Sequence, residues 1–190
     1  MSEYEGALLK DKKIGFGMYL GVEAIMFATL FTNYIIFTPS PHGPQPGELF
    51  EAKSLILSSF FLLSSSFTLI GAERFLSKGK KLGFLIGLGI TFLFAAIFLG
   101  LEVKEFYKYV SEGNGVSANN FMASYFVLVG LHAAHVAFGL GWMAALFTNW
   151  MRNIQKHLYH EKLKIFSYYW HFVDVMWVVI ILVVYLRFLI

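Results

Sequence analysis

Five apolar stretches, each about as long as a bilayer is thick, divide this sequence from end to end. A transmembrane helix needs about 20 consecutive apolar residues, and the backbone groups of a spanning segment must be satisfied within that segment. Helices are therefore the expected spans, and the fold class is all-α. The sequence predicts a five-helix polytopic membrane bundle, forming one transmembrane domain over residues 1–190. The predicted spans are 16–37, 55–75, 82–101, 121–147 and 165–189.

Composition supports the membrane assignment and excludes several kinds of site. Hydrophobic residues make up 57% of the chain and charged residues only 14%, against about a quarter charged in soluble domains. The basic residues lie in short connections between apolar spans, so they indicate orientation rather than nucleic-acid binding. With no cysteine, the chain has no disulfide, thiolate metal site or iron–sulfur cluster.

The distribution of Lys and Arg predicts the orientation. Eleven of these residues lie in the N-terminal segment and in the second and fourth connections. The opposite side has four, which are Lys53, Lys104, Lys108 and Arg187. The positive-inside rule then places the N-terminus in the cytoplasm and the C-terminus outside. The third helix is expected to continue beyond the bilayer, because residues 101–111 keep helical character while becoming charged.

The last span contains an ionisable pair, His171 and Asp174, one helical turn apart and flanked by tryptophans. A carboxylate in hydrocarbon is costly, so it suggests a functional role and a partner. Glu23 lies in the first span, about 10 Å from its cytoplasmic end at 1.5 Å per residue, which matches the depth of His171 and Asp174. This depth match is compatible with a buried carboxylate–imidazole cluster. Proton or lipid handling by Glu23 is favoured over a purely structural hydrogen bond.

Two further histidines, His132 and His135, share one face of the fourth span, among small residues that allow close helix approach. Together with His171 and the two carboxylates they raise the possibility of a metal or haem. A di-iron bundle needs paired Glu-x-x-His motifs on two helices, and this sequence has none. We therefore expect interhelical hydrogen bonding, with no metal ligand and no cofactor-binding residue in this chain.

Polar and small residues of the third span have simpler interpretations. Glu102 and Glu105 lie at its outer end among aromatic residues, where a solvated helix end and a structural contact to the outer loop are about equally favoured. Gly83 and Gly87 have the spacing of a close helix–helix contact. The sequence contains no nucleophile elbow, phosphate loop or dinucleotide fingerprint, so no catalytic residue is predicted.

Several segments together resemble subunit III of the haem–copper terminal oxidases. The run Tyr169-Trp170-His171-Phe172-Val173-Asp174-Val175-Met176-Trp177 looks like the C-terminal signature of that family. Gly130-Leu131-His132-Ala133-Ala134-His135-Val136 resembles its Gly-x-His-Gly-x-His-Val segment, with Ala133 where glycine is usual. Gly21-Val22-Glu23 resembles the helix with the buried carboxylate of the family, and Glu102-Val103-Lys104-Glu105 its Glu-x-x-Glu stretch. The resemblance covers about residues 14–186 and suits the short, five-helix bacterial form.

The resemblance implies a role in a respiratory complex that reduces O2 to water and pumps protons. The chain would be a redox-silent subunit of the bacterial cell membrane, docked on subunit I, which would carry the haem and copper. Subunit II and possibly a small subunit IV would be further partners, and phospholipid would be bound. Glu23 would be the buried carboxylate, and His132, His135, His171 and Asp174 polar residues of the bundle. Such a subunit supports proton uptake and protects the complex during turnover.

Two alternatives remain at this point. An accessory membrane protein of a nitric-oxide reductase system would resemble subunit III in sequence. A small proton channel or transporter would also carry intramembrane carboxylates and histidines, although the inverted repeat and broken half-helices of many transporters are not evident. The electron donor of the complex, cytochrome c or a quinol, belongs to other subunits.

Overall fold

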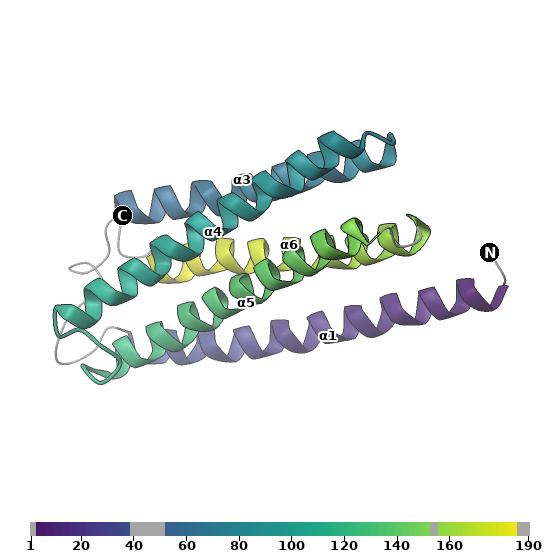
Figure 1. The fold of residues 1–190 in the computed structure, drawn as a ribbon. Helices are drawn as coiled ribbons and strands as arrows, with labels where there is room; N and C mark the ends of the chain where they lie inside the picture. The colour runs from purple at the N-terminus through teal and green to yellow at the C-terminus, as the bar shows by residue number, and fades with distance from the viewer. Residues whose placement is uncertain (1–2, 39–51, 153–155, 186–190) are drawn as a thin grey trace.

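The computed structural model describes residues 3–38, 52–152 and 156–185, and these form long helices that lie side by side (Figure 1). The elements are α1 (Glu3–Ile36), α3 (Ala52–Ser77), α4 (Lys81–Ser111), α5 (Asn120–Met151), α6 (Lys156–Ile180) and the π-helical segment η1 (Ile181–Tyr185). Five helices are long and apolar enough to cross a membrane, which confirms the all-α prediction for the described residues. As predicted, α4 continues to Ser111, whereas the last predicted positions, 186–189, lie outside the described residues.

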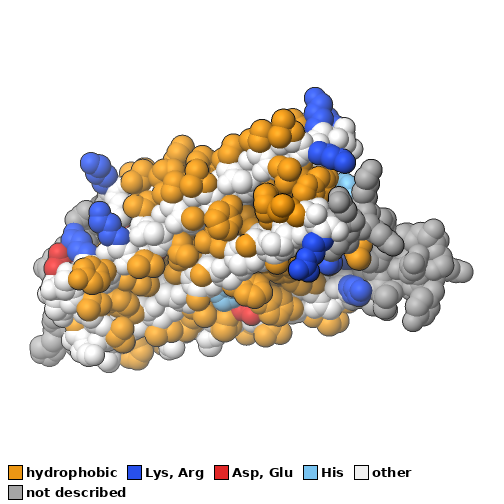
Figure 2. Space-filling model, viewed as in Figure 1, with side chains coloured by type: hydrophobic (Ala, Val, Ile, Leu, Met, Phe, Trp, Pro, Cys, Tyr) orange, Lys and Arg blue, Asp and Glu red, His pale blue; other side chains and the backbone are white. Residues whose placement is uncertain are grey.

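The helices are arranged so that α6 contacts α5, α3 and α1. Figure 1 shows α3 and α4 running next to each other along one side of the bundle, with α1 and α5 along the other. The packed interior is rich in aromatic residues, among which Trp170 and Trp177 of α6 are fully buried. On the face shown in Figure 2, hydrophobic side chains cover much of the surface between the two ends, and basic side chains gather at both ends. This surface suits a bundle surrounded by hydrocarbon.

The α3–α4 pair is held together by a tight turn and a close helix contact. Gly79 adopts a φ of 71°, a left-handed conformation that glycine reaches without steric cost, and the Lys80 N–H then donates to the carbonyl of Phe75 at 2.9 Å. A Cβ placed on Gly87 would lie 2.9 Å from the Cβ of Ala72, and one on Gly83 would meet the ring of Phe75. The predicted close packing at Gly83 and Gly87 is therefore confirmed.

The contact between α5 and α6 depends on another glycine. A Cβ on Gly139 would collide with the buried ring of Trp170, whereas nothing lies within 4 Å of the same position on Gly141. The two glycines are two residues apart on α5, yet one faces the bundle and the other faces away. The side of α5 that carries Gly139 is thus shaped to receive the first tryptophan of the signature run.

Candidate functional site

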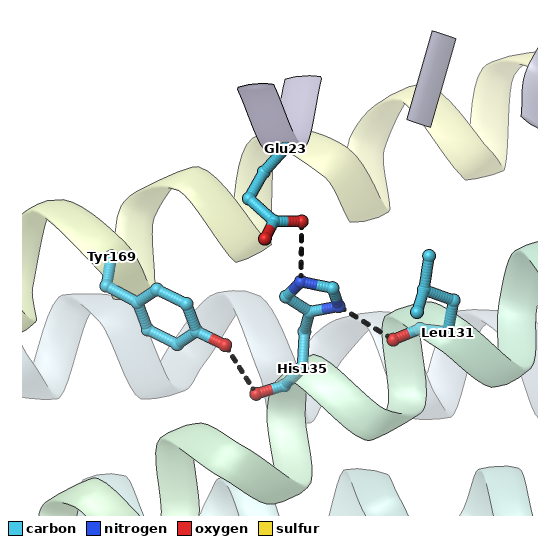
Figure 3. Close-up of polar contacts among 4 residues, drawn as sticks. All are labelled: Glu23, Leu131, His135 and Tyr169. Atoms are coloured by element: carbon cyan, nitrogen blue, oxygen red, sulfur yellow. Dashed lines mark hydrogen bonds and ion pairs between the residues drawn. The ribbon is translucent and has the colours of Figure 1, made fainter. Parts of the chain in front are cut away.

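The first polar centre joins α1, α5 and α6 through His135. Its Nε2 lies 3.2 Å from Glu23 Oε2, and its Nδ1 lies 2.8 Å from the carbonyl oxygen of Leu131 (Figure 3). The Tyr169 hydroxyl of α6 donates to the carbonyl of His135 at 2.9 Å. The His135 and Glu23 side chains are 11% and 16% exposed, so the pair is largely but not completely enclosed. The expected interhelical hydrogen bond is present at His135.

The geometry around His135 determines how the pair can hold a proton. A carbonyl oxygen only accepts hydrogen bonds, so the contact with Leu131 requires a proton on Nδ1. The contact between Nε2 and Glu23 Oε2 then needs one further proton, which either atom can carry. The pair is therefore an imidazolium beside a carboxylate, or a neutral imidazole beside a carboxylic acid. Both states have no net charge, and they differ by one proton transfer.

His171 and Asp174 do not join this centre as the depth match suggested. Asp174 accepts a hydrogen bond from the Ser66 hydroxyl of α3, and no ion pair forms between His171 and Asp174 among the described residues. The depth of Glu23 in the membrane did not decide between a partner on α5 and one on α6, because α1 contacts both helices. The imidazole that faces Glu23 is His135.

Asp174 belongs to a second polar centre, which we call the α3–α6 seam. In this seam Trp170 Nε1 donates to Ser65 Oγ at 3.0 Å, and Trp177 Nε1 donates to Ser59 Oγ at 3.1 Å. Together with the Ser66–Asp174 bond, three side-chain contacts join the two helices. The sequence reading missed these serines. They could have been found as polar residues within an otherwise apolar span, because such residues often hydrogen-bond to a neighbouring helix.

His132 makes ring contacts instead of the expected hydrogen bond. It is fully buried, and neither ring nitrogen has a hydrogen-bond partner among the described residues. Its ring stacks on Trp177 with centroids 5.1 Å apart, and the rings of Phe98 and Phe27 approach it edge-on. Among the described residues, no three His, Cys, Asp or Glu side chains gather as a group that could hold a metal ion.

The third polar centre corrects the interpretation of Glu102 as a solvated residue. Glu102 is only 1% exposed, and Ser58 of α3 is a hydrogen-bonding neighbour of its carboxyl group. Glu105 accepts hydrogen bonds from Ser54 at 2.7 Å and from Tyr109 at 2.6 Å. The reason is that the charged end of α4 continues to pack along α3, so the face with both glutamates turns into the bundle. A contact from the outer loop, 39–51, lies outside the described residues.

Close to this centre, the end of α6 changes from α- to π-helix at η1. Tyr185 and Tyr125 lie with their hydroxyl oxygens 3.0 Å apart, and the Tyr34 hydroxyl donates to the carbonyl of Val184 at 3.3 Å. Short π-helical segments are rare and frequently occur at functional sites. Here the segment presents a backbone carbonyl to α1 and a tyrosine to α5.

Comparison with known proteins identifies the family to which these centres belong. The family described as cytochrome c oxidase subunit III matches residues 2–188. Cytochrome c oxidase subunit 3 of Bacillus sp. (strain PS3) is 40% identical, covering 93% of this chain and 86% of the relative. Cytochrome bo(3) ubiquinol oxidase subunit 3 of Pseudomonas putida is 38% identical, covering 91% and 84%. Quinol oxidase subunit 3 of Bacillus subtilis (strain 168) is 36% identical, covering 97% and 91%.

These relatives carry the names of both cytochrome c and quinol oxidases, at similar identity. The matched region contains all three polar centres, from Glu23 to Asp174. The resemblance drawn from the signature run and the histidine segment is thereby confirmed. The chain belongs to the cytochrome c oxidase subunit III family and is a multi-pass membrane subunit of a haem–copper oxidase complex.

Proposed function

We propose that this chain is the redox-silent subunit III that docks on subunit I, the subunit that carries haem and copper. Subunit II and a small subunit IV complete the complex in the bacterial cell membrane, with the N-terminus of this chain in the cytoplasm. The contacts of His135 and His132 support the redox-silent role. Both ring nitrogens of His135 already have partners, and the ring of His132 is packed among aromatic side chains.

The chain supports proton supply to the complex through the Glu23–His135 pair. The observation that carries this proposal is the contact of 3.2 Å between His135 Nε2 and Glu23 Oε2, a hydrogen bond that needs one proton between the two atoms. This proton can move between Nε2 and Oε2 without a change in the net charge of the pair. Uptake of a proton by one group, concerted with release from the other, also keeps the pair neutral in the membrane, where an isolated charge is costly. Its partial exposure leaves room for exchange at the surface of the bundle. Bound phospholipid stabilises the same surface.

The proposal is tested first on the intact complex. An affinity tag on this chain should retain subunits I and II from native membranes, together with haem in a fixed ratio to the chain. The isolated chain, expressed alone and supplied with haem, should hold none. Stoichiometric haem on the isolated chain, or a tagged chain that retains no oxidase subunit, would contradict the proposal.

The same preparation separates the alternatives. Oxygen consumption with haem retained supports the oxidase role, whereas consumption of nitric oxide without oxygen reduction would favour the nitric-oxide reductase system. Proton flux through vesicles that contain this chain alone would favour a channel. Among the described residues, no feature favours either alternative over the oxidase role.

A further inference from the structure

His171 of the signature run takes no part in the three polar centres. Its side chain is half-buried, and it forms no hydrogen bond or ion pair with any of the described residues. Asp174, one helical turn further along α6, bonds to Ser66 instead. Within the part of the chain that the structure describes, the imidazole therefore has hydrogen-bonding capacity that no neighbour uses.

His171 lies on the outward face of α6. The exposed apolar side chains of this helix include Tyr168, Val175, Val178 and Leu182, at intervals of seven, three and four residues. Such intervals follow one face of a helix, and His171, three residues after Tyr168 and four before Val175, belongs to the same face. We call these five residues the α6 outer face. Because α6 packs against α3, α5 and α1, and α5 also packs against α1, the outer face lies between α1 and α3.

The depth of His171 distinguishes a protein partner from a lipid headgroup. His171 follows Lys164, the last basic residue before the apolar run, by seven residues, which is about 10 Å of helix. Lysine and arginine side chains near helix ends are long enough to reach the interface, whereas an imidazole is too short to cover this distance. Hydrocarbon offers no acceptor for the ring N–H, so the imidazole requires a polar group at its own depth. A second membrane-spanning helix supplies such a group.

The exposed face of α4 lacks this requirement. Leu82, Ile86, Ile90 and Leu93 are exposed at intervals of four, four and three residues, and each of them is apolar. A stripe of this kind is fully satisfied by hydrocarbon. The α6 outer face differs from it by an imidazole among apolar side chains, and this difference assigns the partner helix to α6.

We propose that the α6 outer face is the contact surface for a membrane-spanning helix of another oxidase subunit, which places a hydroxyl or carboxyl oxygen next to His171. This oxygen accepts the ring N–H, and Val175 and Val178 pack against the apolar side chains of the partner helix. The inference rests on the proposed docking of this chain in the complex, and it names the surface and the polar contact that the docking uses.

Photochemical cross-linking in the intact complex tests the surface. Benzoylphenylalanine introduced at Val175 should cross-link to a membrane span of another subunit, within one turn of a residue with a hydroxyl or carboxyl group. Leu93 of α4 is the matched control, because it is 56% exposed against 55% for Val175. The two positions also lie at similar depth, 12 residues after Lys81 and 11 after Lys164. The same photoreactive residue at Leu93 should give no cross-link to that span.

A second measurement tests the hydrogen bond itself. His171→Phe keeps an aromatic ring but removes both ring nitrogens, so the affinity of the tagged chain for the other subunits in detergent should fall about threefold, as for an average hydrogen bond between membrane helices. His171→Gln keeps a side-chain N–H and should restore most of the affinity. His160→Phe makes the same change at an exposed position of α6 before the apolar run, and it should leave the affinity unchanged.

Three results would overturn the inference. These are cross-links from Val175 that reach only lipid or a second copy of this chain, cross-linking at Leu93 as strong as at Val175, and a wild-type affinity in His171→Phe. If His171→Phe does not fold, the cross-link from Val175, which leaves His171 in place, decides alone. Haem and oxidase subunits retained by the tagged chain report the docked role separately, so failure of the outer face leaves that role standing.

Discussion

The α3–α6 seam and the Glu23–His135 pair use similar polar residues in different ways. In the seam, Asp174 and Ser66 are only 8% and 7% exposed and bond to each other across two helices. In the pair, the Glu23 and His135 side chains are 16% and 11% exposed, and Oε2 and Nε2 lie 3.2 Å apart. The seam therefore resembles a closed structural contact, and the pair resembles a site of exchange. Similar chemical groups thus form an enclosed contact between helices in one place and, in the other, the partly exposed pair for which we propose proton handling.

The helices that carry the two centres also differ in how much of their surface is buried within the chain. Of the most apolar stretch of α1, only 6% is buried within the chain, against 44% for the last span. Helices in lipid associate through close packing and hydrogen bonds, because lipid supplies no hydrophobic driving force between them. The α3–α6 seam combines both with large aromatic rings. We therefore expect the stability of the bundle to depend more on the seam than on the pair.

The largest loss of stability is expected for Trp170→Ala. Trp170 is fully buried, donates to Ser65 and fills the space beside Gly139, so its removal leaves a cavity and breaks a hydrogen bond between α6 and α3. A cost of about 3–5 kcal/mol in the free energy of unfolding is expected, measured by denaturation in mixed detergent micelles. Phe67→Ala, at a ring that is 75% exposed, is the control and should change little. Equal losses in both variants would contradict the importance of the seam.

A smaller loss is expected for Gly139→Ala. The added methyl group collides with Trp170, which is enclosed and has no room to move, so overpacking should cost about 1–3 kcal/mol. Gly141→Ala makes the same chemical change on the open side of α5. It should leave stability unchanged or raise it slightly, because alanine favours a helix by up to about 1 kcal/mol over glycine. The same denaturation assay compares the two, and a reversed order would disprove the packing described for α5 and α6.

Removing the hydroxyl of Ser66 should cost about 1 kcal/mol, because Ser66→Ala deprives the buried Asp174 carboxyl group of its donor. Ser77→Ala is the matched control, since the Ser77 hydroxyl is exposed and bonds only within α3, to the carbonyl of Arg74. Denaturation curves and the yield of assembled complex would report the difference. No difference between Ser66→Ala and Ser77→Ala would show that the Asp174 contact does not stabilise the seam.

The smallest effect on stability is expected for Glu23→Gln. A glutamine retains an oxygen and a donor close to His135, and single hydrogen bonds between membrane helices are worth about 0.6 kcal/mol on average. The assembled yield and unfolding curve should therefore remain close to wild type. A loss as large as that of Trp170→Ala would remove the distinction between pair and seam, because Glu23 would then be a principal structural contact.

Much of the fold could be predicted because the physics of a bilayer acts on local sequence. Apolar runs of sufficient length determine which segments form spans, and the glycine spacing of α4 predicted a close helix contact, whose partner the structure shows to be α3. The pairing of polar residues depends on the relative rotation of helices that are far apart in sequence. Depth along a helix was known from counting residues, but it did not decide whether Glu23 faces His135 or His171.

Two further misses have similar causes. The serines of α3 carry no charge, so the sequence did not single them out as it did Asp174. Yet Ser66 bonds to Asp174, and the two neighbouring tryptophans donate to Ser65 and Ser59. Glu102 lies where a helix is expected to leave the bilayer, so a solvated helix end and a contact to the outer loop were about equally favoured, and packing against α3 was not considered. Its burial follows from the continued packing of α4 on α3, which is a tertiary property.

The working lifetime of the oxidase tests the central distinction most directly. The measurement is the number of turnovers before activity decays, compared among wild type, Glu23→Gln and the control Glu112→Gln, which changes an exposed carboxylate at the end of α4. With equal haem content and equal stability, we predict that Glu23→Gln shortens this number and that Glu112→Gln leaves it unchanged. An unchanged number of turnovers in normally assembled Glu23→Gln would contradict a role of the pair in proton supply.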